Sequence, residues 1–171
     1  MLKEIVIWPT EENKGHERGA FFEKLANTIF STQRYKVSGN IQFTGREFDL
    51  HCEHMDRSNE RCLVECKAKQ SLSSDEIKKF VFSASFDNFD YGYFLYTRNF
   101  ERQAGGLIKE IQADERYKTL YFWNAEKVIE LLVASGSVAD FVLNEKALDV
   151  SKVILLYSYK GIYWVPILSS G

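Results

Sequence analysis

Residues 46–69 read REFDLHCEHMDRSNERCLVECKAK. Segments 46–54 and 61–69 each carry apolar residues through their centres, and the polar, turn-forming sequence MDRSNE separates them. This arrangement predicts an antiparallel β-hairpin. If the hairpin turns about Arg57, Asp49 and Glu65 are equally far from its centre, so they are expected to lie opposite each other on the two strands.

The predicted hairpin gathers charged groups on one face. Alternate residues of a strand share a face, so Asp49 lies with His51, and Glu65 lies with Lys67. Opposed residues have Cβ atoms about 5 Å apart, and two carboxylates this close repel each other unless a cation lies between them. We therefore expect Asp49, Glu65 and the backbone carbonyl of Cys66 to bind Mg²⁺, which prefers oxygen ligands. The Lys67 ammonium would orient an attacking water and stabilise a pentacovalent phosphate.

Helical and strand patterns continue on both sides of the hairpin. We expect helices over 16–31, 73–86, 101–113 and 124–133, and strands over 5–8, 35–43, 91–96 and 119–123. The early strands follow one another and the later ones alternate with helices. This order predicts an α/β sandwich in which helices flank a mixed central β-sheet.

A second hairpin is expected near the end of the chain. Segments 153–157 and 162–165 are apolar and flank Lys160-Gly161, a turn signal. We therefore divide the chain into a domain of residues 1–136 and a C-terminal extension of residues 137–171. The extension is expected to lead into a further region that is absent from this sequence.

The composition limits the classes of protein that fit. The chain has 171 residues, 45% of them hydrophobic, with a formal net charge of −2. The balanced charge excludes a basic, tail-driven nucleic-acid binder, but it does not exclude a nuclease whose metal site uses carboxylates. No apolar run approaches the roughly 20 residues that cross a bilayer. Three cysteines, an odd number, are typical of a reducing compartment. We expect a cytoplasmic protein with no membrane partner and with reduced thiols.

The helix expected over 16–31 and the two strands of the hairpin together resemble the PD-(D/E)xK nuclease superfamily, and most closely its Mrr-type restriction endonuclease domains. That family has a helical Gly-x-x-Phe-Glu signature, then an Asp on a strand, then a (Glu/Gln)-x-Lys on the next strand. Here Gly19–Glu23, Asp49 and Glu65-Cys66-Lys67 match in the same order. The similarity covers about residues 15–135.

The resemblance implies a restriction-endonuclease-like sandwich and a Mg²⁺-dependent DNA endonuclease in which Mn²⁺ can substitute. It implies catalytic roles for Asp49, Glu65, Lys67 and Glu23. The sequence departs from the family where a Gly doublet is expected, because Gly45-Arg46-Glu47 stands there. The accessory acid is therefore either Glu23 or Glu47.

The resemblance also implies a biological setting. The expected substrate is double-stranded DNA, and a homodimer would supply the two active sites that cutting both strands requires. The domain would be the N-terminal effector of a bacterial restriction or anti-phage defence protein. A C-terminal regulatory or ATPase region of the same protein would control it.

Two interpretations without catalytic activity remain open. The chain could be a catalytically silent, nuclease-like module that binds nucleic acid or dimerises, although such a relative is expected to have lost one of Asp49, Glu65 and Lys67. The hairpin could also be a surface element with an ordinary set of cross-strand charges. Its apolar neighbours Phe48 and Leu63 favour a functional site over this second possibility.

Overall fold

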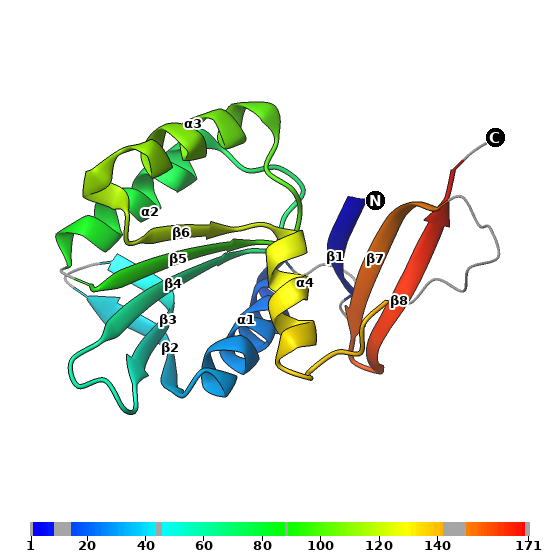
Figure 1. Cartoon of the computed structure of the whole chain (residues 1–171), viewed down its shortest axis with the longest axis horizontal. Helices are drawn as coiled ribbons and strands as arrows, with labels where there is room; N and C mark the ends of the chain where they lie inside the picture. Colours follow the sequence, from blue (N-terminus) through cyan, green and yellow to red (C-terminus); the bar gives the residue numbers. More distant parts are fainter. Residues whose placement is uncertain (1, 9–14, 44–45, 88, 142–149, 170–171) are drawn as a thin grey trace.

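The computed structural model describes residues 2–8, 15–43, 46–87, 89–141 and 150–169, which form two mixed β-sheets and four α-helices (Figure 1). Within these ranges no helix is long and apolar enough to cross a membrane. Every helix and strand expected from the sequence is present, with bounds that differ by at most three residues. The elements in chain order are β1 (Leu2–Trp8), α1 (Gly15–Thr32), β2 (Tyr35–Phe43), β3 (Arg46–His54), β4 (Arg61–Lys67), α2 (Ser74–Phe86), β5 (Tyr91–Tyr96), α3 (Arg102–Ala113), a 3-10 turn (Glu115–Tyr117), β6 (Leu120–Trp123), α4 (Ala125–Ala134), β7 (Val150–Ser158) and β8 (Gly161–Leu168).

The larger sheet has the strand order β2-β3-β4-β5-β6. Its first three strands pair antiparallel and its last three are parallel. Cys52 pairs with Cys62 and Leu50 with Val64, which confirms the register expected for a turn about Arg57. Helices α1 and α4 cover one face of this sheet, and α2 and α3 cover the other (Figure 1). The predicted mixed α/β sandwich is confirmed.

The central strands are apolar because both of their faces are covered by helices. Val64 and Leu95 pack toward α1 and α4, whereas Leu63 and Phe94 pack toward α2 and α3. All four side chains are fully buried. The charged residues of β4 therefore lie in a strand whose neighbouring residues are buried in the apolar core.

The smaller sheet joins segments from opposite ends of the chain. Strand β1 pairs parallel with β7, which in turn pairs antiparallel with β8 in the predicted second hairpin. Ile5, Ile7 and Leu155 pack into the same core as α1 and α4, so these helices lie between the two sheets (Figure 1). Residues 2–8 thus lie beside the extension of residues 137–171, of which the structure describes 137–141 and 150–169.

Backbone hydrogen bonds and buried charge connect the two sheets. The Ile5 N–H donates to the Thr97 carbonyl (2.9 Å), and the Thr97 N–H donates to the Lys67 carbonyl (3.2 Å). Next to Ile5, the Glu4 side chain is only 5% exposed and forms an ion pair with Arg98 (2.8 Å). A single residue, Thr97, therefore links the smaller sheet to the last residue of β4.

Two glycines give a matched test of the packing between β5 and α2. A Cβ added at Gly92 would lie 2.8 Å from the side chain of Leu120 on β6 and 3.1 Å from both the Cβ of Ala84 and the ring of Phe80 on α2, whereas one added at Gly106 would meet nothing within 4 Å. We expect Gly92→Ala to lower the free energy of unfolding by about 1–3 kcal/mol through overpacking. Gly106→Ala, on an exposed face of α3, should raise it by about 0.5–1 kcal/mol.

Urea denaturation followed by tryptophan fluorescence measures both changes. The two variants carry the same substitution, so differences in the unfolded chain largely cancel between them. A Gly92→Ala protein as stable as Gly106→Ala would contradict the close approach of β5 to α2.

Candidate active site

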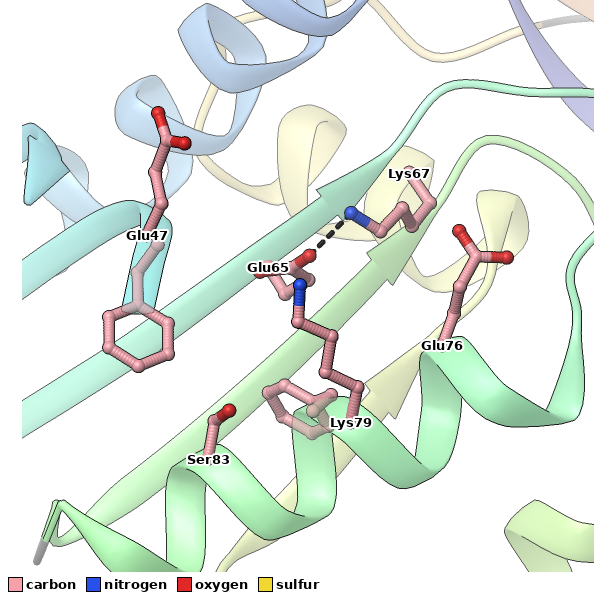
Figure 2. Close-up of a pocket in the computed structure, with 8 residues that line it drawn as sticks. Glu47, Glu65, Lys67, Glu76, Lys79 and Ser83 are labelled. Atoms are coloured by element: carbon pink, nitrogen blue, oxygen red, sulfur yellow. Dashed lines mark hydrogen bonds and ion pairs between the residues drawn. The ribbon is translucent and has the colours of Figure 1, made fainter. Parts of the chain in front are cut away.

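A small pocket lies between the end of β4 and the first turns of α2 (Figure 2). Its volume is about 120 Å³, which is more than one water molecule needs. Three elements supply the side chains around it. The lining residues are Glu47 and Phe48 of β3, Glu65 and Lys67 of β4, and Glu76, Lys79, Phe80 and Ser83 of α2.

Local sequence explains how the two walls are built. Glu65 and Lys67 alternate along β4 with buried residues, so both side chains leave the strand on the side of α2. Helix α2 begins with a capping box, in which the Ser73 side chain accepts from the Glu76 N–H and the Glu76 side chain accepts from the Ser73 N–H. The cap fixes Glu76 at the mouth of the pocket, and the helical repeat places Lys79 and Ser83 beside it.

Asp49 occupies the junction between β3 and β4. Its Oδ2 accepts a hydrogen bond from the Cys66 N–H (2.6 Å). Asp49 directly precedes Leu50, which pairs with Val64, and Cys66 lies two residues after Val64. The N–H and C=O of one strand residue point to the same side, so the Cys66 carbonyl also faces β3. The carboxylate thus takes the place of a backbone carbonyl in the ladder, which holds Asp49 next to the residues of β4.

The side chains around this junction do not alternate as regularly as the sequence suggests. Phe48 packs with α2 and α3, whereas Leu50, two residues on, packs toward α1 and α4. Phe48 and His51 both contact the ring of Phe89, although strict alternation would place them on opposite faces. The alternation of side chains is therefore interrupted around Asp49, whose carboxylate reaches the β4 backbone.

The two acids of the hairpin are electrostatically strained. Burial raises the pKa of the Asp49 carboxyl, although the hydrogen bond from Cys66 and the charge of Lys67 oppose this change. Burial and the neighbouring Asp49 both raise the pKa of Glu65. Burial alone would lower the pKa of Lys67, but the charge of Glu65 and the ion pair between them raise it. The Lys67 ammonium offsets part of this charge, yet the pKa values of both acids stay raised.

Figure 2 shows how the charges converge in the pocket. The Lys67 Nζ pairs with Glu65 Oε1, and the Lys79 ammonium points from α2 toward the same carboxylate. The charge of Lys79 lowers the pKa values of both Asp49 and Glu65. Glu76 and Ser83 were not predicted as pocket residues, although the Ser73–Glu76 capping signal and the spacing 76, 79, 83 would have placed them on one helical face with Lys79.

The two candidates for the accessory acid lie on different sides of Asp49. Burial, followed by the charge of Asp49, raises the pKa of Glu23 on α1. The charge of Lys67 lowers this pKa, and the charge of Glu47 raises it. Glu47 is exposed and lines the pocket directly. Gly45, which precedes Arg46-Glu47 where the family has a Gly doublet, lies outside the described residues. Both acids therefore lie within electrostatic range of the site.

The site contains oxygen donors suited to a hard cation. In the described part of the chain, no group of three or more His, Cys, Asp or Glu side chains is arranged to hold a metal ion. Mg²⁺, however, commonly uses one or two carboxylates together with waters and substrate phosphate. Two partly buried carboxylates beside a carbonyl that faces β3 fit that requirement.

The cysteines have no part in the pocket lining. Cys52, Cys62 and Cys66 are free thiols, buried in the core beside α1 and α4. Burial raises the pKa of each thiol, which disfavours the thiolate needed for nucleophilic attack or zinc binding. The expected reduced, structural cysteines agree with this arrangement.

The raised pKa of Asp49 has a consequence for stability. Below about pH 4, the ordinary range of an Asp carboxyl, this group is protonated in both the folded and the unfolded chain. As the pH rises, the unfolded chain releases the proton first, so the folded state loses stability. We expect Asp49→Asn, which keeps an acceptor for the Cys66 N–H, to be more stable than the wild type at pH 7. The difference should shrink toward pH 4.

Urea denaturation at the two pH values measures this difference. Glu53→Asn, at an exposed position further along β3, is a suitable control for the loss of one carboxylate. If Asp49→Asn destabilised the protein more at pH 7 than at pH 4, the carboxylate would be stabilised in the fold rather than strained.

Comparison with known protein families agrees with this geometry. A family model described as a restriction endonuclease, the Mrr catalytic domain, matches residues 16–132, which include α1, the hairpin, the pocket and most of α4. No curated protein matches the chain significantly. The match covers more than half of the chain, and it confirms the resemblance to nucleases of the PD-(D/E)xK type. Because this model spans the fold, the hairpin and the pocket, the chain belongs to the restriction endonuclease family.

Proposed function

We propose that this protein is a Mg²⁺-dependent DNA endonuclease that hydrolyses phosphodiester bonds at the pocket between β4 and α2. The observation that carries the proposal is the pair of partly buried carboxylates, Asp49 and Glu65, whose pKa values are raised by desolvation while an ammonium group adjoins them. Such a pair is unfavourable in a purely structural role, and it matches what a cation-assisted phosphoryl-transfer site requires.

Asp49, Glu65 and the carbonyl of Cys66 would hold the ion, and Mn²⁺ could replace Mg²⁺. The bound ion supplies positive charge that polarises the phosphodiester and promotes ionisation of water. The hydrogen bond from the Cys66 N–H keeps Asp49 oriented toward this position. The same bond aligns the Cys66 carbonyl, because both backbone groups of Cys66 face β3.

Lys67 would act on the reacting groups. Its ammonium lies in the pocket wall and pairs with Glu65. When Glu65 serves as a ligand, the ammonium can turn to the attacking water and to the charge that develops on the phosphate. Its raised pKa keeps it protonated at neutral pH, which suits charge stabilisation better than proton abstraction.

Glu23 would support the site from α1. Its pKa is raised by burial and by Asp49, so it can hold a proton closer to neutral pH than an exposed acid does. Glu47 lines the pocket and is the alternative for this role. Comparing Glu23→Gln with Glu47→Gln in cleavage assays would distinguish the two.

The wider setting is also part of the proposal. The substrate would be double-stranded DNA, the active form a homodimer, and the location the cytoplasm, in keeping with three free thiols. Residues 1–136 would be the nuclease-like unit and residues 137–171 an extension that leads to a regulatory or ATPase region. The whole would act in bacterial restriction or anti-phage defence.

One observation favours the alternative of a catalytically silent module. Glu65 is engaged by Lys67, and among the described residues no three-ligand metal cluster is formed. A module of this kind would still bind DNA or dimerise through the same fold. The two proposals differ in whether a divalent cation binds and whether DNA is cut.

Plasmid digestion with Mg²⁺, and with EDTA instead, tests the proposal. We expect nicking or linearisation only with the metal ion. Lys67→Ala should lower the cleavage rate by about 100- to 1000-fold, because it removes a charge that acts on the transition state, while DNA binding is retained. Lys127→Ala, which removes a surface ion pair on α4, should cleave like the wild type. Near wild-type cleavage by Lys67→Ala would remove this residue from the mechanism.

Metal binding can be measured apart from cleavage. At a Mg²⁺ concentration 100 times the dissociation constant, binding to the folded state alone should add about 2.7 kcal/mol to the stability of the wild type. Asp49→Asn should lose most of this gain, and excess Mn²⁺ should partly restore its cleavage but not that of Lys67→Ala. A wild-type melting temperature that does not respond to Mg²⁺ or Mn²⁺ would favour the silent module.

A further inference from the structure

Two phenylalanines project from α2 beside the pocket. Phe82 and Phe86 are 61% and 62% exposed, and their rings stack at a centroid distance of 5.7 Å and an interplanar angle of 29°. The other phenylalanine of this helix, Phe80, is 3% exposed and belongs to the core. Large apolar side chains with this much accessible surface are typical of contact surfaces.

Helical geometry places the ring pair against the pocket. Residues three apart on a helix are neighbours, so Phe82 adjoins Lys79, and Phe86 adjoins Ser83. Lys79 and Ser83 both line the pocket. The distance along the helix axis from Lys79 to Phe86 is about 10 Å at 1.5 Å per residue, which is comparable to the span of two or three nucleotides. A DNA strand that enters the pocket and continues along α2 would therefore pass over these rings.

We propose that Phe82 and Phe86 form a stacking platform for unpaired bases of the DNA strand whose phosphodiester enters the pocket. The proposal rests on the proposed function and deepens it, since it names the form of the substrate: double-stranded DNA with locally unpaired bases next to the bond that is cut. Aromatic faces bind bases of any kind by stacking.

Charge on the same helix favours nucleic acid as the occupant. Lys78 lies one turn before Phe82 on the exposed side of α2, with 65% of its side chain accessible, and Lys79 lies between the rings and the acids of the site. Ammonium groups on both sides of an aromatic surface suit a strand whose phosphates alternate with bases. A protein partner seated on the same rings would instead cover the entrance to the pocket.

Binding to short oligonucleotides in EDTA tests the platform without cleavage. The full chain is titrated against single-stranded DNA, a duplex with a one-base gap, and a fully paired duplex, each carrying 2-aminopurine at a central position. We expect tighter binding of the first two substrates, with a change in 2-aminopurine fluorescence. Phe82→Ala and Phe86→Ala should each weaken that binding by about 5- to 150-fold, the range typical of loss of one stacking ring.

Matched variants distinguish base stacking from nonspecific apolar binding and from a loss of folding. Phe82→Leu and Phe86→Leu keep apolar bulk without a ring, and they should bind nearly as weakly as the alanine variants. Tyr159→Ala removes an aromatic residue that is 60% exposed in the turn between β7 and β8, and it should bind like the wild type. The urea midpoint of each alanine variant is measured beside the binding assay, so that a loss of folding is told apart from a loss of stacking.

Several outcomes would overturn the platform. One is equal affinity of the wild type and the phenylalanine variants for the unpaired substrates. A second is full recovery with leucine, which would indicate apolar docking. A third is a dimer, seen by light scattering, that the alanine variants convert to a monomer without change in DNA affinity. That result would assign the rings to contact with a second copy of the chain.

The two proposals can fail separately. If the wild type binds unpaired DNA through the rings but does not cut plasmid with any divalent cation, the stacking platform holds and the nuclease proposal fails. If plasmid is cut at the same rate by the wild type and by the Phe82→Ala, Phe86→Ala double variant, and both bind alike, the nuclease proposal holds and the platform fails.

Discussion

The hydrogen bond from the Cys66 N–H to the Asp49 carboxylate holds β3 against β4 where the apolar part of the hairpin ends and the candidate site begins. It continues the strand ladder with a side chain, and so it fixes a carboxylate where a carbonyl would otherwise lie. The cost is a buried charge next to a second acid, Glu65, and the pKa values of both acids rise. The placement of Lys67 and Lys79 follows from this constraint, since each offsets the charge of the two acids.

The rest of the fold keeps this unfavourable arrangement in place. Helices cover both faces of β4, so the strand cannot move its acids into solvent without exposing Leu63 and Val64, which are fully buried. The smaller sheet adds a second restraint, because Ile5 and Thr97 form a chain of backbone hydrogen bonds that ends at the carbonyl of Lys67. A strained site on a rigid support is typical of catalytic centres.

Helix α2 connects the chemistry to the surface of the molecule. One of its faces packs into the core through Ile77, Phe80 and Ala84, and a neighbouring face lines the pocket. Its outer face carries the exposed ring pair. A helix with three such faces has no simple amphipathic pattern, which explains why its role in the site is harder to recognise in the sequence than that of β4.

The sequence by itself determined the order and type of the elements, the register of the hairpin and the family, because alternation, helical spacing, turn residues and the Glu-x-Lys spacing are local signals. Gly19–Glu23 and Glu65–Lys67 carried the family resemblance before any fold was known. Only the tertiary structure decided that β1 joins β7, that Phe48 leaves its alternating face, and that α2 closes the pocket over Glu65. Each of these depends on contacts between segments far apart in the chain, for which a single sequence holds no local signal. The hydrogen bond between Asp49 and the N–H of Cys66 likewise forms only once β3 and β4 have paired.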